Sequence, residues 1–367
     1  MDRIITASLA MFALLLSGCQ SPKNPLLEPW DTPFGVPAFA DITTAHYMPA
    51  FTEGMKLHRD EIRAIAESPE SPTFANTIEA LDGSGSVLTR VSNVFFSMNS
   101  SMTSDSMQAV AREVAPLLSK HRDEILLNDR LFQRVKAVYD ARDGLSLTDE
   151  QRMLLTKTYR QFARGGALLD AAAKEQLTSI NEELSLLQVK FGEHTLAGNN
   201  SFELVIEDKA DLAGLPDGVV AAAAEAANDR KHPGKWVFTL HKPSMIPFLQ
   251  YARNRALREK IYSGYINRGN NNDSLDNKAT VSRIVRLRQQ RVDLLGYATH
   301  AHYVLEENMA KEPNNVYALL RQLWTPALTR AKAEVYDMQK IIDREKGNFK
   351  LAPWDWWYYA EKVKKAK

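Results

Sequence analysis

The stretch "AKEQLTSINEELSLLQVKF" (173–191) has apolar residues at alternating intervals of four and three, namely Ala173, Leu177, Ile180, Leu184, Leu187 and Phe191. This spacing keeps them on one face of an α-helix and forms a seam like that of a coiled coil. The "LAGNN" that follows contains Gly198, and glycine readily adopts the left-handed conformation found just past helix ends. The sequence therefore predicts one long helix that ends near Gly198.

Segments before this stretch repeat the same helical spacing. "TDEQ" (148–151) places a threonine and a glutamine three residues apart, as in a capping box. A second long helix is predicted from Asn314 to about Glu345, just before Gly347. These patterns indicate a mainly α fold. Its earlier apolar stripes are Phe51, Met55, Ile62 and Ile65; Ile78, Leu81, Leu88, Val91, Phe95 and Met98; Met107, Val110, Val114, Leu117, Leu118 and Ile125; and Leu131, Phe132, Val135 and Tyr139.

Two short segments have the alternation of strands instead. "SFELVIED" (201–208) alternates Phe202, Leu204 and Ile206, and "KWVFTL" (235–240) alternates Trp236, Phe238 and Leu240. Such alternation is typical of half-buried strands. An alanine-rich helix is expected between them, so the sequence predicts a small antiparallel β insert in one large multi-helix domain, residues 44–367.

The composition is that of a globular protein and gives no sign of a nucleic-acid partner. Of 367 residues, 44% are hydrophobic and 25% charged, and 46 basic residues against 45 acidic ones leave a net charge of +1. Nucleic-acid binders normally carry a basic surplus. Arginines cluster in "RNRALREK" (253–260) and "RIVRLRQQR" (283–291), which we interpret as solvated, ion-paired helix faces.

The amino terminus, "MDRIITASLAMFALLLSGCQ", has a basic Arg3, an apolar run from Ile4 to Leu16, and a small pair before Cys19. The run is too short to span a bilayer and has the form of a secretory signal. Its end resembles the lipobox of bacterial lipoproteins, in which the signal is cut before an acylated cysteine. We expect a lipoprotein signal peptide over 1–19 with lipid attachment at Cys19; the alternative is an ordinary signal with an incidental cysteine.

A linker is expected over residues 20–43, because five prolines there prevent long regular structure. Cys19 is the single cysteine of the chain. If it is acylated, no thiol remains for a disulfide, a nucleophile or a thiolate zinc site.

No catalytic, cofactor-binding or metal residue is predicted from the sequence. None of the eight histidines forms HExxH, and the "HAH" at 300–302 would point its imidazoles to opposite sides of a helix. "HRDEI" occurs at 58–62 and 121–125, where each His–Glu pair could offer two ligands. We interpret both copies as salt-bridged surface turns, since neither has a third ligand nearby. "DGSGS" (82–86) lacks the GxSxG spacing of a nucleophile elbow and indicates a break or kink in a helix.

The sequence ends with "APWDWWYYAEKVKKAK" (352–367), in which three tryptophans and two tyrosines lie within 354–359. Aromatic side chains of this size normally belong to a core or a ligand wall. We therefore expect an uncovered apolar patch here, a core segment separated from the partner that covers it.

Several stretches in the same order resemble bacterial peptidyl-dipeptidases, zinc metallopeptidases of the thimet-oligopeptidase family. The resemblance runs from about Asn24 to Lys367 and corresponds to the amino-terminal half of such enzymes. It is carried by "NPLLEPWDTPFGVPAFADITTAHYMPAFTEGM" (24–55), "SPTFANTIEALDGSG" (71–85), "YRQFARGGALL" (159–169), "KPSMIPFLQYARNRALREKIYSGYINRG" (242–269), "LGYATHAHYVLEENMAK" (295–311) and the closing aromatic stretch.

The resemblance implies an enzyme that removes dipeptides from the carboxyl end of oligopeptides. It implies a two-lobed helical fold around a channel, of which this chain forms one wall. Zn²⁺ would be bound by an HExxH helix and a further glutamate in the second half. No catalytic, zinc or substrate-anchoring residue of the family maps onto this chain. The chain as given is therefore expected to bind no zinc and to be inactive without the missing carboxy-terminal catalytic half.

Two alternatives remain open. The chain could be a non-catalytic helical lipoprotein that binds peptides or a partner protein, or the zinc half could be encoded separately and dock onto this one. In each case the lipobox places the protein in the cell envelope, anchored in the membrane through its lipid. Gln20 and Ser21 after the cysteine are compatible with the periplasmic side of the outer membrane in a diderm.

Overall fold

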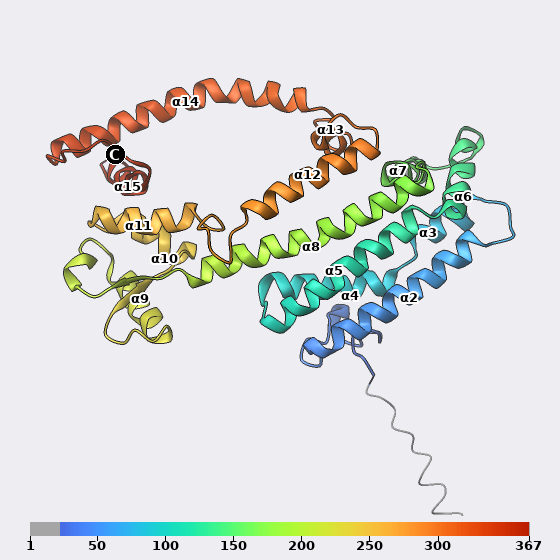
Figure 1. Ribbon diagram of the computed structural model, residues 1–367, viewed down its shortest axis with the longest axis horizontal. Helices are drawn as coiled ribbons and strands as arrows, with labels where there is room; N and C mark the ends of the chain where they lie inside the picture. Colours follow the sequence, from blue (N-terminus) through green and yellow to red (C-terminus); the bar gives the residue numbers. More distant parts are fainter. Residues whose placement is uncertain (1–22, 367) are drawn as a thin grey trace, which may run out of the picture. The chain divides into compact units, whose positions relative to one another are not determined.

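The computed structural model describes residues 23–366, so the predicted signal peptide and Cys19 lie outside the described residues. Helices joined by short turns make up most of the chain, with one two-stranded sheet (Figure 1). The predicted mainly α fold with a small antiparallel insert is confirmed. The chain divides between Glu182 and Glu183 into two compact units, and each is described by itself.

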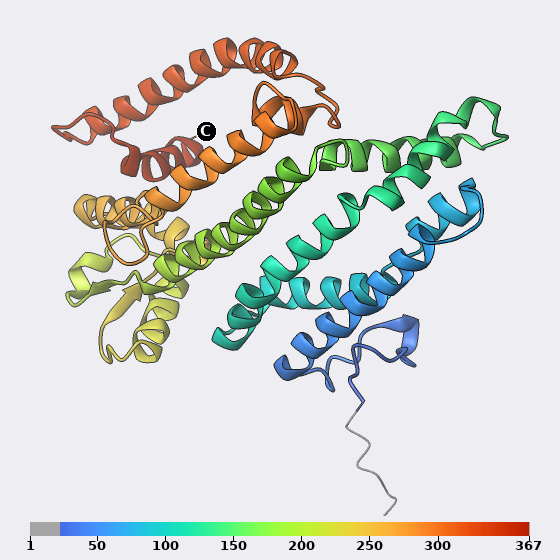
Figure 2. The same cartoon turned by 45° about the vertical axis from the view of Figure 1, so that its right-hand side comes forward.

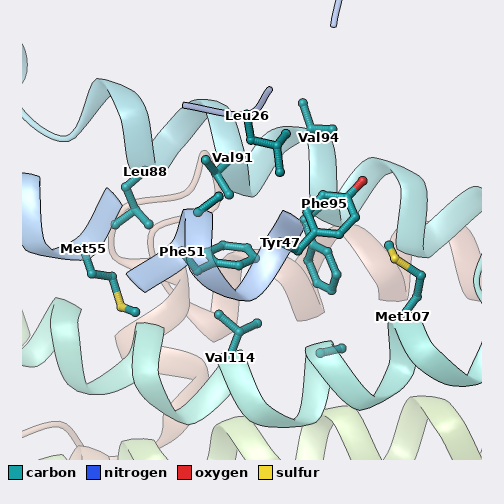
Figure 3. Close-up of a cluster of buried hydrophobic side chains, with 12 residues drawn as sticks. Leu26, Tyr47, Phe51, Met55, Leu88, Val91, Val94, Phe95, Met107 and Val114 are labelled. Atoms are coloured by element: carbon teal, nitrogen blue, oxygen red, sulfur yellow. The ribbon is translucent and has the colours of Figure 1, made fainter. Parts of the chain in front are cut away.

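The first unit has two apolar clusters that share helix α2. One lies between α2, α4 and α5, where the Phe95 ring meets Tyr47 and Phe51 edge-on at 5.0 and 5.4 Å (Figure 3). The other is formed with α6 and α7. The elements are η2 (Pro33–Gly35), η3 (Thr44–His46), α2 (Tyr47–Ala66), η4 (Phe74–Glu79), α3 (Ala80–Asp82), α4 (Ser86–Ser101), α5 (Asp105–Leu126), α6 (Asp129–Asp140), η5 (Arg142–Gly144), α7 (Asp149–Gly165) and the start of α8 (Ala171–Ser201).

Helix starts in this unit follow the local sequence. The predicted capping box is confirmed, because the Thr148 hydroxyl accepts from the Gln151 N–H at 3.2 Å and the Gln151 amide oxygen accepts from the Thr148 N–H at 3.0 Å. The "DGSGS" stretch separates α3 from α4, which confirms the predicted break.

The proline-rich stretch packs onto the first unit in its described part. Leu26 is fully buried in the cluster of Figure 3, and its carbonyl accepts from Arg90 Nη2 at 3.1 Å. The Arg90 guanidinium also lies 5.1 Å from the Trp30 ring centroid. Between residues 23 and 43, regular structure is limited to the three-residue η2, in keeping with the prolines.

The second unit places its small sheet among helices. The strands are antiparallel, with Leu204 opposite Phe238 and Ile206 opposite Trp236. Val237 is buried together with Phe238, so the predicted strict alternation of the second strand is wrong; α9 and α10 both contact β2. The elements are β1 (Leu204–Ile206), η6 (Lys209–Leu212), α9 (Asp217–Asp229), β2 (Trp236–Phe238), α10 (Lys242–Tyr251), α11 (Arg255–Ile266), α12 (Lys278–Leu294), α13 (His300–Leu305), α14 (Pro313–Arg344), η7 (Pro353–Asp355) and α15 (Trp356–Lys365).

Helix α8 continues beyond its predicted end. It runs to Ser201, and Gly198 lies within it without a positive φ. Polar groups of the last turn find partners elsewhere in the second unit: the Asn200 carbonyl accepts from Arg230 Nη1 at 3.1 Å, and Arg268 Nη1 donates to Asn199 Oδ1 at 3.4 Å. The turn therefore does not need a left-handed glycine cap. Along the predicted seam, Leu177 and Leu184 are buried, whereas Phe191 is exposed.

A buried carboxylate fixes the aromatic carboxy-terminal segment. Asp355 is fully buried; it accepts from Arg258 Nη2 at 2.8 Å and from Arg255 Nη2 at 2.9 Å. The Arg258 guanidinium also lies 4.2 Å from the centroid of the Tyr358 ring. Our interpretation of "RNRALREK" as a solvated face is thus wrong for Arg258, which is 1% exposed. Its counter-charge lies 97 residues away, beyond the reach of local spacing.

The aromatic stretch is covered by its own unit, contrary to the expected uncovered patch. Tyr359 is 5% exposed and packs with Phe349 and Ile342, while Trp357 packs against the cluster around the small sheet. Helices α10 and α14 supply contacts to α15, and α11 supplies contacts to η7. The cover therefore comes from residues that precede the stretch in the sequence.

We predict that Asp355→Asn lowers the free energy of unfolding by about 3–5 kcal/mol, because it leaves the buried Arg258 guanidinium without its counter-charge. Urea unfolding would measure the change. Asp343→Asn, at an exposed position on α14, is the matched control and should change stability by less than about 0.5 kcal/mol. Equal effects of the two substitutions would contradict the anchoring role of Asp355.

Candidate functional site

Histidines and carboxylates do not converge as metal ligands in the described part of the chain. Within residues 23–366, no group of three or more histidine, cysteine, aspartate or glutamate side chains is arranged to hold a metal ion. In "HAH", His302 Nδ1 lies 2.8 Å from the Thr299 hydroxyl at the start of α13. Burial, with the charges of Arg291 and Arg288, lowers the pKa of His300.

The two "HRDEI" copies meet each other in the first unit. His121 Nε2 on α5 lies 3.0 Å from His58 Nδ1 on α2, and the rings are 5.0 Å apart. Arg59 of one copy pairs with Glu124 of the other at 3.9 Å, so salt bridging is present. The prediction of surface turns is nevertheless wrong for His121, which is 4% exposed. One signal was available: His121 continues the apolar stripe of its helix, seven residues after Val114 and four before Ile125.

A chain of hydrogen bonds links this pair to the turn between α3 and α4. The Ser84 hydroxyl donates to the Leu81 carbonyl at 2.7 Å and lies 3.2 Å from His58 Nε2. Because the hydroxyl proton is used there, Nε2–H of His58 is the donor to Ser84, and Nδ1 of His58 accepts from Nε2–H of His121. Nδ1 of His121 is buried without a partner.

This order is that of a structural chain and not of an activated nucleophile. An activated serine would give its proton to the imidazole, whereas Ser84 gives it to a carbonyl. The adjacent backbone N–H, that of Gly85, is bonded to Glu61 Oε2 at 2.7 Å and is not free to stabilise an oxyanion.

Burial keeps both imidazoles neutral. Burial, and to a smaller extent the nearby His58 and Arg59, lowers the pKa of His121 to about 4. Burial also lowers the pKa of His58, against an opposing effect of Glu61. Both histidines line a cavity of about 380 Å³ whose polar lining includes Thr158 and Gln161. The site is a neutral polar cluster within an apolar unit.

A second candidate site is the apolar surface of α14 in the second unit. In Figures 1 and 2, α15 lies beside the carboxy-terminal part of α14, where Met338 and Ile342 are buried. The rest of the helix exposes large apolar side chains, with Trp324 66% exposed. We call this set the α14 face: Tyr317, Leu319, Leu320, Leu323, Trp324, Leu328, Val335 and Tyr336.

The α14 face is more than a few scattered surface residues, because every residue from 317 to 330 is exposed and several of them are large and apolar. Exposed apolar surface of this extent marks interaction sites in soluble proteins, which makes the face a candidate contact for another protein segment. No helix between residues 23 and 366 is both long and apolar enough to cross a membrane.

Comparison with known proteins shows what the chain resembles. Residues 248–367 match Peptidase family M3. The chain is 38% identical to the dipeptidyl carboxypeptidase of Escherichia coli (strain K12) over 94% of its own length and 50% of that protein. It is 35% identical to the Salmonella typhimurium dipeptidyl carboxypeptidase (94% of the chain, 51% of that protein), and 29% identical to Escherichia coli oligopeptidase A (93% and 50%). The chain thus spans about half the length of the curated relatives it matches.

We predict that Gly85→Ala lowers the free energy of unfolding by at least about 1–2 kcal/mol, the cost of the left-handed conformation for an L-residue. Gly85 has φ +73°, and an added Cβ would meet His58 ring atoms at 2.7–2.9 Å. Gly83→Ala is the matched control two residues away, because Gly83 has φ −77° and its Cβ would lie 3.5 Å from the nearest atom. Thermal or urea unfolding that ranks the two variants the other way would contradict the packing of His58 against this turn.

Proposed function

Because the chain belongs to peptidase family M3, we propose that it forms the amino-terminal part of a zinc metallopeptidase that releases dipeptides from the carboxyl end of oligopeptides. The observation that carries this proposal is the match of nearly the whole chain to dipeptidyl carboxypeptidases, at higher identity than to oligopeptidase A. Peptide hydrolysis is common to both groups of relatives. Dipeptide release is the more specific part of the proposal.

The described residues do not fit a zinc site, because no three candidate ligands converge among them. We therefore assign zinc binding and the chemical step to the part of the relatives' length that this chain does not cover. The chain alone is expected to hydrolyse no peptide. Its proposed role is to form one wall of the substrate channel, which would admit extended oligopeptides and exclude folded proteins.

The α14 face supports a contact with that second half. This chain matches about half the length of these relatives. A second half of similar length would need a surface on this chain to pack against. The exposed amino-terminal part of α14 provides an apolar surface for it, and burying such side chains contributes about 25 cal/mol per Å². The same face would suit the alternative, a non-catalytic helical lipoprotein that binds peptides or a partner protein.

We further propose that the protein is anchored in the cell envelope through a lipid on Cys19, which lies outside the described residues. The support is the sequence alone: a short apolar run followed by Ser17, Gly18 and Cys19. On this proposal the first described residues would lie close to the membrane surface, on the periplasmic side of the outer membrane in a diderm.

The peptidase proposal is tested with an amino-terminally blocked tetrapeptide and two proteins, this chain and a form extended by a carboxy-terminal half of the relatives' kind. We predict that the extended form releases the carboxy-terminal dipeptide, as measured by mass spectrometry, and that 1,10-phenanthroline abolishes this release. The chain alone should release nothing. Release of single amino acids, or chelator-sensitive release by the chain alone, would contradict the proposal.

We predict that Cys19→Ala moves the protein out of the membrane fraction of the producing cells, because a bilayer anchor requires the acylated cysteine. Incorporation of labelled palmitate, followed by fractionation, would measure this. Ser17→Ala is a suitable control, since it keeps a small residue before the cysteine. An unlabelled wild-type protein, or a Cys19→Ala variant that still takes up palmitate, would show that Cys19 is not the attachment site.

A further inference from the structure

We propose that His58, His121 and Ser84 form a proton-sensitive latch that, at neutral pH, holds the turn between α3 and α4 closed between two cavities of the first unit. We call these three residues the latch and residues 83–85 the turn. This proposal concerns the first unit alone and does not depend on the peptidase activity.

The turn separates two cavities. One is the cavity of about 380 Å³ that the two histidines line. The other has a volume of about 590 Å³, and its lining includes Trp30 and Arg90. Asp82 and Ser84 belong to the lining of both. A displacement of the turn would therefore join the two spaces.

The closed position depends on contacts with α2. Gly85 lies so close to the His58 ring that no Cβ fits between them, and its N–H donates to Glu61 Oε2 at 2.7 Å. The neighbouring Ser84 is bonded to His58 Nε2. Without a neutral, correctly oriented His58, the turn loses its bond to α2 through Ser84. It keeps the Glu61 bond, the bond of the Ser84 hydroxyl to Leu81, and backbone bonds to its own flanking helical turns.

Protonation cannot leave this arrangement unchanged. A proton on His58 Nδ1 would place it opposite Nε2–H of His121 at 3.0 Å, so that two donors face each other. A proton on His121 Nδ1 would create a buried cation at an atom that has no partner. Either event favours a state in which the imidazoles separate and reach water.

Charged neighbours do not remove this preference. On α2, Arg59 opposes a charge on His121 and Glu61 favours one on His58. On α5, Glu124 is paired with Arg59, and the Asp123 carboxylate accepts from Asn181 Nδ2 of α8 at 3.1 Å; Arg122 also lines the cavity.

The remaining elements around the pair add one more charge. Asp82 is the last residue of α3, directly before the turn, whereas α7 contributes the uncharged Thr158 and Gln161 to the cavity. Burial is the largest influence on the pKa of each histidine, and it favours the neutral form of both.

The direction of the pH dependence follows. A histidine whose pKa is depressed in the closed state stabilises that state above its ordinary value of 6.5, and this stabilisation is lost as the pH falls toward about 4. When one such group opens to an ordinary environment, lowering the pH from about 7 to about 5 raises the opening equilibrium by roughly 20-fold relative to a non-titrating residue.

Hydrogen exchange of the full chain tests the latch. We expect amides of residues 83–88, after correction for the intrinsic pH dependence of exchange, to exchange roughly 20-fold faster through opening at about pH 5 than at about pH 7. In the His58→Gln/His121→Gln variant this ratio should fall to about that of the rest of the unit. His46→Gln is the matched control and should keep the wild-type ratio, since His46 is a half-buried residue that caps η3 in the same unit and belongs to neither the latch nor the lining of the two cavities.

Two results would overturn the proposal: the same corrected exchange at both pH values in the wild type, or an undiminished ratio in the double variant. If the double variant does not fold, NMR titration of the wild-type histidines decides. Titration of His58 and His121 below 6.5, with faster exchange of the turn over the same pH range, supports the latch. If both histidines titrate at about 6.5, or if they titrate without any change in the exchange of the turn, the proposal is overturned.

Discussion

The buried ion pair between Asp355 and Arg258 determines how the second unit is closed. It ties the last helix to α11, although the two residues are 97 positions apart, and leaves neither charge in water. With η7 held in this way, α15 packs against Met338 and Ile342 in the carboxy-terminal part of α14. A pair of this kind fixes position more than it adds stability, because desolvation offsets much of its attraction.

The first unit depends on a small polar cluster between its helices. The neutral His58–His121 pair lies between α2 and α5 and connects these helices to the turn before α4. Gly85 permits this connection, since only glycine combines φ +73° with contact to the His58 ring. Both units thus use a small buried polar cluster to join segments that are distant in sequence.

The sequence correctly predicted the features that depend on the spacing of neighbouring residues. The helices, the capping box at Thr148, the break at "DGSGS" and the two strands all follow from patterns within one or two turns of chain. Prediction from the sequence failed where the contacting residue lies far away along the chain. Arg258 looked like a solvated residue because its carboxylate is 97 positions distant, and His121 looked like part of a surface turn because His58 is 63 positions distant. The cover of the aromatic segment and the exposure of α14 were missed for the same reason, since burial is decided by packing between elements.

We propose that the α14 face packs against a second half of a longer enzyme. Hydrogen exchange of α14, compared between this chain and the extended form, tests this contact. We expect amides over residues 317–336 to become at least about tenfold more protected in the extended form, while those near the already buried Met338 and Ile342 change little. Equal exchange of residues 317–336 in the two forms would contradict it.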